Sequence, residues 1–117
     1  MIYVQHLLGI GHLQRSLYLA AELARHNFQV ELVSGGMPHK LTMPELVQLR
    51  QLPPVYSPDG SFSRLLDADG TEIDSAWRAI RKHQLLEIFE SFAPHVLITE
   101  TFPFGRRMMR FELIPLL

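Results

Sequence analysis

A glycine-histidine turn near the start of the chain carries the residues best suited to chemistry. Gly9, Gly11 and His12 lie between a short apolar segment and a stretch with helical spacing. A turn from a strand into a helix exposes backbone N–H groups at the positive end of the helix dipole, and such a place favours an anion. An imidazole at the same turn can act as a general base. The turn therefore predicts an anion-binding or catalytic site, and the alternative is a histidine that caps its own helix or meets solvent.

A catalytic histidine would also need a carboxylate that orients its ring, and Glu100 is the candidate. This residue directly follows the apolar segment His95–Thr99. Arg15 and Ser16 follow His12 on the predicted helix, where Arg15 would reach an anion held by the turn unless it is an ordinary solvated arginine. We therefore expect His12 and Glu100 to form a catalytic pair, with Arg15 and Ser16 as candidate anion-binding residues beside them.

A second group of candidates comes from the arginines of the segment "FPFGRRMMR". If a helix begins near Gly105, Arg106 and Arg107 occupy its first turn, where positive charge opposes the helix dipole. An anionic ligand, an anionic lipid or an acidic partner surface would favour such an arrangement. Arg106 is therefore a candidate binding residue, and the alternative is a set of ordinary solvated arginines.

The familiar nucleotide-binding and metal-binding patterns are incomplete. A dinucleotide fingerprint requires a third small residue where the chain has Gln14, and an acidic residue where the second apolar segment ends in "VSGG". The chain has no Gly-Lys-Ser/Thr sequence of a phosphate loop. No spacing of histidines and carboxylates suggests a metal site, and His6 is interpreted as a packing residue. We therefore expect no cofactor.

Composition limits the class of protein. The chain has 117 residues, of which 47% are hydrophobic and 20% charged, and this suits one globular domain. A formal net charge of -1 gives no electrostatic reason to expect a nucleic acid as partner. The absence of cysteine excludes disulfides and thiolate metal sites, and no apolar run approaches the roughly 18 residues of a membrane span. Because no signal-peptide pattern precedes the first apolar segment, the expected location is the cytoplasm.

Apolar segments alternate with segments of helical periodicity. The predicted strands are Met1–Gln5, Gln29–Ser34, Val47–Leu52 and His95–Thr99. The predicted helices are His12–His26, a short one at Lys40–Leu46, Thr71–Phe92 and Gly105–Leu117, and Thr71 and Asp74 have the spacing of a capping box. A long loop is predicted over Pro54–Gly70. This alternation predicts an α/β protein whose parallel sheet has helices on both faces. In the doubly wound order 3-2-1-4, the first and fourth strands are neighbours. That order places His12 beside Glu100, and it places Gly35 and Gly36 on the same rim.

Four stretches taken together resemble a known family. They are "QHLLGIGHLQRSLYLAAELARH", "VELVSGGMP", "LPPVYSPDGSFSRLLDADG" and "VLITETFPFGRRMMRFEL", which cover most of the chain. They resemble the N-terminal half of the predicted MurG-like glycosyltransferases, whose GT-B architecture has two facing Rossmann-like domains. The resemblance implies that residues 1–117 form the acceptor-side Rossmann-like domain, truncated at its C-terminal end, and that the donor domain is absent.

The resemblance also implies roles for the residues of the turn. Gly9 and Gly11 match the family's glycine-rich first loop, which is longer in the peptidoglycan enzyme and there meets the acceptor's diphosphate. In related sugar transferases a histidine at this turn is the general base and a carboxylate orients it, so His12 and Glu100 would take these roles. The chain would then be half of a hexosyltransferase that moves a sugar from a nucleotide-sugar donor to an acceptor hydroxyl.

The same resemblance predicts the partners. A nucleotide-sugar donor would be held by the missing C-terminal domain or by a partner subunit. A sugar or a lipid-linked molecule would be the acceptor, and a lipid-linked one would bring peripheral contact with the inner face of the membrane. The alternative is a non-catalytic module of the same fold, which would hold an anion at the glycine turn and dock a partner through the segment around Arg106, because fold does not determine function.

Overall fold

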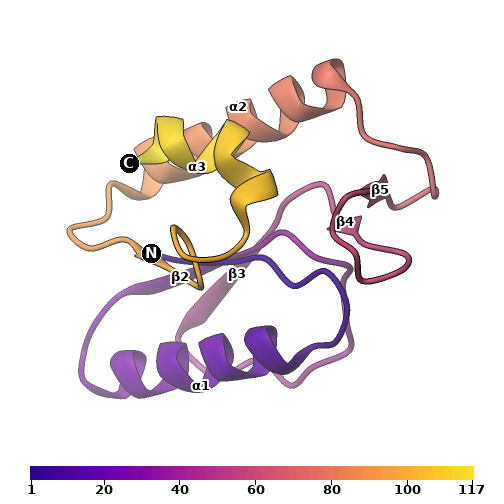
Figure 1. Cartoon of the computed structure of the whole chain (residues 1–117). Coiled ribbons are helices and arrows are strands. Elements are labelled where there is room, and N and C mark those ends of the chain that lie inside the picture. Colours follow the sequence, from indigo (N-terminus) through magenta and orange to yellow (C-terminus); the bar gives the residue numbers. More distant parts are fainter.

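Four parallel strands form the central sheet. In the computed structural model, which describes residues 1–117, β1 (Ile2–Val4), β2 (Val30–Ser34), β3 (Val47–Gln51) and β6 (Ile98–Thr99) lie in the order β3-β2-β1-β6 (Figure 1). Every neighbouring pair of strands is parallel. This arrangement confirms the predicted class and the predicted order, although the fourth strand is shorter than expected.

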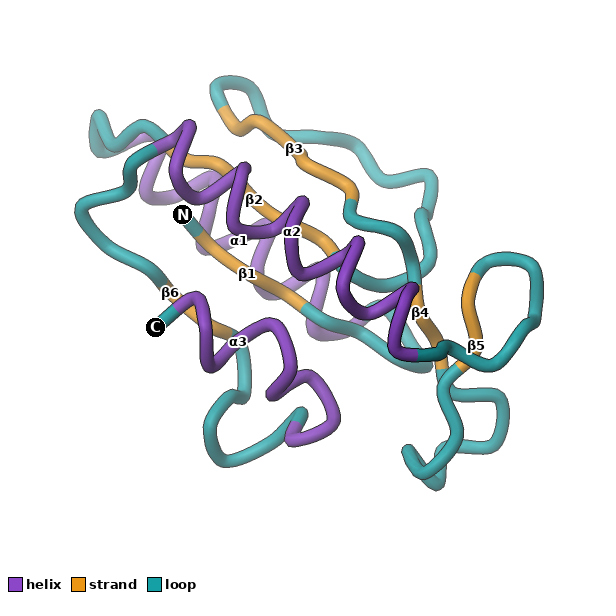
Figure 2. The backbone as a smooth tube through the Cα atoms, turned by 90° about the horizontal axis from the view of Figure 1, so that it is seen from above, coloured by secondary structure: helices purple, strands orange, loops and turns teal.

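Helices cover both faces of the sheet, as predicted. In Figure 1, α1 (Gly11–Arg25) lies below the sheet, whereas α2 (Ser75–Phe92) and α3 (Arg110–Leu116) lie above it. A short 3-10 turn, η1 (Arg107–Met109), leads into α3. Figure 2 shows from above that α2 and α1 run on opposite sides of the strands and that α3 lies beside α2.

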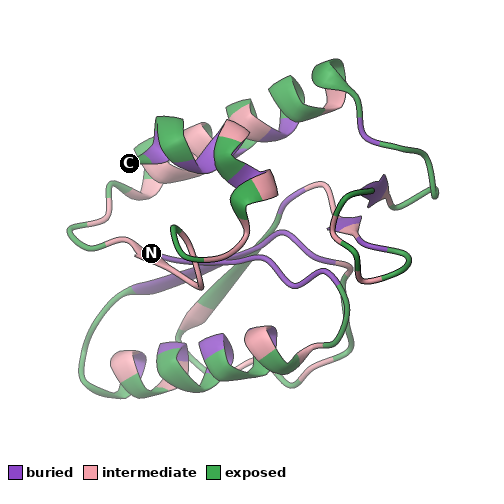
Figure 3. Ribbon diagram, viewed as in Figure 1, coloured by how far each residue is buried: buried purple, intermediate pink, exposed green.

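The face of α1 that meets the sheet is apolar at helical spacing. Leu13, Leu17, Ala20 and Ala24 are buried, and the opposite side of the helix is exposed (Figure 3). These side chains pack against residues of β1 and β2, namely Ile2, Val4, Val30 and Leu32. The helix ends at Arg25, one residue before the predicted end at His26, and Asn27 then adopts a left-handed backbone with φ of 66°.

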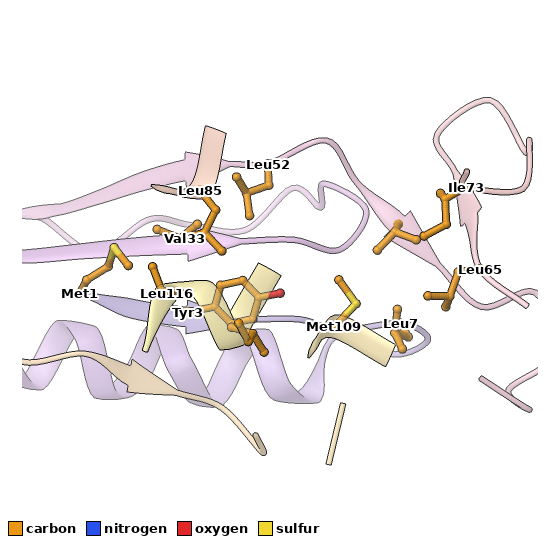
Figure 4. Close-up of a cluster of buried hydrophobic side chains, with 12 residues drawn as sticks. Met1, Tyr3, Leu7, Val33, Leu52, Leu65, Ile73, Leu85, Met109 and Leu116 are labelled. Atoms are coloured by element: carbon orange, nitrogen blue, oxygen red, sulfur yellow. The ribbon is translucent and has the colours of Figure 1, made fainter. Parts of the chain in front are cut away.

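The other face of the sheet carries the larger apolar core. Tyr3 and Val33 of the sheet lie in one cluster with Leu85 of α2 (Figure 4), and Leu113 of α3 belongs to the same cluster. The remaining buried members are Met1, Leu7, Leu52, Val55, Leu65, Ile73, Met109 and Leu116. Because segments from both ends of the chain meet here, this core fixes α2 and α3 on the sheet.

A fully buried ion pair crosses this core. Arg81 of α2 donates from Nε to Glu112 of α3 at 2.8 Å, and neither side chain is exposed. Arg81 also donates to the carbonyl oxygens of Gly35 and Pro53, at 3.0 and 2.8 Å, and Tyr3 donates its hydroxyl to Glu112. Burial, followed by the charge of Glu112, raises the pKa of the Tyr3 phenol well above its ordinary value. Burial by itself would lower the pKa of Arg81, but Glu112 and Tyr3 together outweigh that effect and the pKa is raised.

The long loop predicted over Pro54–Gly70 contains a two-stranded antiparallel ribbon instead, formed by β4 (Val55–Tyr56) and β5 (Leu66–Asp67). Residues after β5 extend the pairing, because Asp67 N–H donates to the carbonyl oxygen of Thr71 and Ile73 N–H donates to that of Leu65. These bonds engage the residues expected to start the next helix. That helix therefore begins at Ser75, and the helix cap is Asp74, whose carboxylate accepts from the Trp77 N–H at 2.7 Å, and not Thr71.

Two other element predictions are wrong. Residues 40–46 form no helix, and a turn around Glu45 and Leu46 leads directly into β3. The helix expected from Gly105 begins only at η1, because Arg106 has a left-handed backbone with φ of 56° that no helix accommodates. The arginines at 106 and 107 therefore do not occupy the first turn of an α-helix.

Candidate functional site

His12 and Glu100 meet at the carboxyl ends of the strands. His12 lies in the first turn of α1, and Glu100 is the first residue after β6. The distance between His12 Nδ1 and Glu100 Oε1 is 2.7 Å. This is the proximity expected from the strand order, because β1 and β6 are neighbours and Glu100 N–H donates to the carbonyl oxygen of Tyr3 at 3.0 Å.

The hydrogen bond defines the useful form of the imidazole. A carboxylate only accepts, so the shared proton lies on Nδ1 of His12 and the neutral ring carries its lone pair on Nε2. No group of the protein hydrogen-bonds to Nε2, and the His12 side chain is 33% exposed. Glu100 is 13% exposed, and its second oxygen, Oε2, is buried without a partner. His12 therefore has one ring nitrogen, Nε2, open to a ligand, while a mostly buried carboxylate fixes the ring through Nδ1.

The start of α1 adds open hydrogen-bond donors. The first bond of the helix is from Gln14 N–H to the carbonyl oxygen of Ile10, so the N–H groups of Gly11, His12 and Leu13 have no backbone acceptor. No side chain caps the helix, and its first turn contains no acidic residue. These N–H groups are free to donate hydrogen bonds to an anion beside the imidazole.

Gly9 and Gly11 are not required by packing within the chain. A Cβ atom at either position would meet nothing within 4 Å, and neither residue has a positive φ. Both glycines are exposed. Their lack of a side chain leaves the backbone of the turn open to approach from outside the protein.

Arg15 lies on the site, whereas Ser16 does not. Arg15 Nη1 is 3.6 Å from Glu100 Oε1, and its side chain is 73% exposed. Ser16 is buried on the face of α1 that meets the sheet. Because helix positions one apart point in different directions, only Arg15 can reach a ligand at the rim.

Gly35 and Gly36 end β2 at the same rim but lie beneath its surface. The Gly35 N–H donates to the carbonyl oxygen of Val4, and a Cβ atom at this position would clash with the side chains of Arg81 and Gln5. A Cβ atom at Gly36 would clash with His6 in the same way. Close packing therefore explains these glycines.

Arg106 is held at the rim by two contacts that no helix supplies. Its Nε donates to the carbonyl oxygen of Gln5 at 2.8 Å, and its guanidinium lies 5.5 Å from the centre of the Phe62 ring. The segment from Ser57 to Leu65 thereby packs next to the end of β1. Arg106 contributes positive charge near the turn, but it contacts neither His12 nor Glu100.

Two residues beside the site, His6 and Thr101, were not predicted to belong to it. His6 is buried as the packing interpretation required, with Nε2 2.9 Å from the carbonyl oxygen of Met37, but its Nδ1 has no partner. Burial lowers the pKa of His6, so the ring is neutral near pH 7. Thr101, directly after Glu100, adopts φ of 68°, which is rare for a β-branched residue, and no sequence signal marks it.

Other kinds of site find no support. No group of three or more histidine, aspartate or glutamate side chains is placed to hold a metal ion. None of the helices combines the length and the apolar character needed to cross a membrane. A groove of about 650 Å³ lies at the amino ends of the strands, whereas His12 lies at their carboxyl ends.

Comparisons of the chain with models of protein families, with curated proteins and with solved structures found no match. The resemblance to MurG-like transferases therefore depends on the sequence stretches quoted above.

Proposed function

We propose that the chain is the acceptor-side half of a glycosyltransferase of GT-B type. The observation that carries the proposal is the 2.7 Å hydrogen bond between His12 Nδ1 and Glu100 Oε1 at the carboxyl rim of a parallel sheet. In open parallel α/β sheets, ligands bind at this rim next to the point where the strand order reverses. Here that point lies between β1 and β6, the two strands that lead to His12 and Glu100.

The geometry supports a general-base step. His12 Nε2 takes the proton of an acceptor hydroxyl while the hydroxyl oxygen bonds to the anomeric carbon of the donor sugar. The bond from that carbon to the nucleotide diphosphate breaks, and its electron pair leaves with the diphosphate. Glu100 keeps the ring in the correct tautomer and stabilises the imidazolium that forms.

The open N–H groups at the start of α1 and the nearby Arg15 would hold a negatively charged group of the acceptor or donor. A nucleotide-sugar donor requires a second domain or a partner subunit facing this rim. The open N–H groups also support a second candidate function, in which the chain is a non-catalytic module that binds an anion at this turn.

Turnover tests the proposal. The protein, together with its donor-binding half, is assayed with a panel of nucleotide sugars and acceptors, as wild type and as His12→Ala. Loss of the general base should lower kcat by about 100-fold or more. Tyr18→Ala is the control, because Tyr18 lies on the exposed side of α1, and this variant should leave kcat unchanged. Near-normal turnover of His12→Ala would remove the base assignment, and anion binding without any sugar transfer would favour the binding module.

A further inference from the structure

The hydrogen-bonded pairing between β1 and β6 ends at Glu100. The amide of Glu100 donates to the carbonyl oxygen of Tyr3 at 3.0 Å, in line with the parallel register of the two strands. Because parallel pairing repeats every two residues, the next bond would run from the Phe102 amide to the carbonyl oxygen of Gln5. That bond is absent, and the chain loops away from β1 directly after β6 (Figure 2). The Gln5 carbonyl therefore needs a donor from elsewhere.

The side chain of Arg106 supplies this donor. Its Nε donates to the carbonyl oxygen of Gln5 at 2.8 Å, and no other group of the chain donates to that oxygen. The guanidinium is half-buried, and its Cζ lies 5.5 Å from the centre of the Phe62 ring. A rigid side-chain N–H thus occupies the place that the amide of a longer β6 would take.

The residues between Glu100 and Arg106 form a turn that closes on itself. Thr101 has a left-handed backbone with φ of 68°, and this ends the extended conformation of β6. The Gly105 N–H donates to the carbonyl oxygen of Thr101 at 2.6 Å, which brings the chain back to the start of the turn. A Cβ atom at Gly105 would lie only 3.2 Å from the Cβ of Thr101, so the closure is tight. This closure returns Arg106 to the rim where Glu100 lies.

The direction of the Glu100 carboxylate depends on the pairing of this segment with β1. Side chains along a strand alternate between the two faces of the sheet. Ile98 packs in the apolar cluster between the sheet and α1, so Glu100, two residues later, points to the same face. That face carries the first turn of α1, where the carboxylate meets His12 Nδ1 at 2.7 Å. A segment that frayed from β1 at this point would lose that direction.

We propose that Arg106 is a positioning residue for the pair of His12 and Glu100. Its Nε replaces the missing strand amide on Gln5, so the turn after β6 stays fixed to β1 and the Glu100 carboxylate stays at His12 Nδ1. Arg106 contacts neither member of the pair and acts through the backbone of the turn. Its effect on the rate of sugar transfer rests on the proposed function, whereas its effect on the geometry of the pair does not.

Nitrogen NMR of the His12 ring tests the geometry on the whole chain. The ¹⁵N shifts of the two ring nitrogens report which of them carries the proton, and at about pH 8 the wild type should carry it on Nδ1, facing Glu100. Arg106→Met removes the donor but keeps a long side chain against Phe62, and it should shift His12 toward the Nε2–H tautomer. Arg107→Met is the matched control, because it removes the charge of the exposed neighbouring arginine, and it should leave the tautomer unchanged.

Turnover in the presence of the donor-binding half separates positioning from substrate binding. Arg106→Met should lower kcat by about tenfold and leave KM nearly unchanged, because a misplaced base slows the chemical step without weakening binding. Phe62→Leu keeps the Nε donor and removes the ring beside the guanidinium, so kcat should fall by roughly two- to fivefold, the scale of an exposed cation–π contact. Urea denaturation shows whether each variant folds, and Phe62→Leu carries both measurements if Arg106→Met does not fold.

Three results would overturn the proposal. The first is an unchanged His12 tautomer in folded Arg106→Met, which would mean that Glu100 is held without Arg106. The second is an equal shift of the tautomer in Arg107→Met, which would assign the effect to lost charge alone. The third is a raised KM with kcat unchanged, which would assign Arg106 to direct contact with a substrate. Absence of sugar transfer by the wild type would contradict the proposed function, and the tautomer measurement would still decide the role of Arg106.

Discussion

Two charged pairs connect distant parts of this chain, and they differ in how completely they are satisfied. Arg81 and Glu112 are both fully buried, and the guanidinium donates to the carboxylate, two carbonyl oxygens and two other side chains. His12 and Glu100 are partly exposed, with an unbonded ring nitrogen and an unpartnered carboxylate oxygen. A saturated buried pair holds layers together, whereas an unsaturated pair at the rim has groups left for a ligand.

The two pairs should also differ in what their loss affects: the buried pair affects the free energy of unfolding, and the rim pair affects the chemistry of the site. Removing one member of the buried pair strands a charge in a dry core, which is costly to folding. Removing a member of the rim pair leaves a group that water can reach. Variants of the two pairs should therefore change different measurements.

The largest effect is expected from the buried pair. Arg81→Met leaves the Glu112 carboxylate buried without a counter-charge, so the free energy of unfolding should fall by about 3–5 kcal/mol. Urea denaturation measures the loss. The double variant Arg81→Met/Glu112→Leu removes both charges and should recover most of the stability. A single variant that loses less than about 1 kcal/mol would contradict a structural role for the pair.

The next effect concerns the rim pair. Glu100→Gln removes the charge that orients and stabilises the His12 ring, so kcat should fall by about 10–100-fold in the assay described above. The free energy of unfolding should change by less than about 1 kcal/mol, because the site borders solvent. If Glu100→Gln lowered kcat further in a His12→Ala background, the carboxylate would have a role independent of the histidine.

A smaller effect is expected from His6 as the pH changes. Burial lowers the pKa of His6 in the folded protein below the value of 6.5 that applies to the unfolded chain. The unfolded chain therefore binds a proton first as the pH falls below about 6.5, and the free energy of unfolding should decrease with it. Urea denaturation between pH 7.5 and 5 measures the slope. His6→Gln should flatten it, and an unchanged slope would show that other groups cause the dependence.

The smallest effect is expected from Arg15→Ala. Arg15 is 73% exposed and its contact with Glu100 is long, at 3.6 Å, so the variant should change the free energy of unfolding by no more than about 0.5 kcal/mol. If the arginine holds an anion at the turn, KM for a charged substrate should rise while kcat stays the same. A fall in kcat with KM unchanged would assign Arg15 to the transition state instead.

Much of the fold could be predicted from local patterns. The helix α1 and the strand β2 were predicted correctly. A helix with one buried face has apolar residues at helical spacing, and a strand covered on both faces is apolar throughout. The boundaries of α2 and of the segment around Arg106 were not predictable in the same way. Pairing of β5 with the residues after it moved the start of α2 to Ser75, and a left-handed residue at Arg106 delayed the last helix.

The candidate site could be predicted in part. The strand order, taken from the general rule for doubly wound sheets, was enough to place Glu100 beside His12. The glycines were harder to interpret, since Gly9 and Gly11 face open space while Gly35 and Gly36 make room for Arg81 and other side chains. Local packing requires glycine at Gly35 and Gly36 but not at Gly9 and Gly11, and the sequence does not record which atoms surround each position.

By itself the sequence determined the α/β class, the helices on both faces and the position of the His12 turn, because each depends on periodicity within a short window. Only the tertiary structure showed that Arg81 meets Glu112, and only it gave the distance and exposure of the expected pair of His12 and Glu100. Arg81 reaches Glu112 across 31 residues and His12 reaches Glu100 across 88. The exposure of these pairs follows from packing between segments far apart in the chain, and no local pattern contains that information.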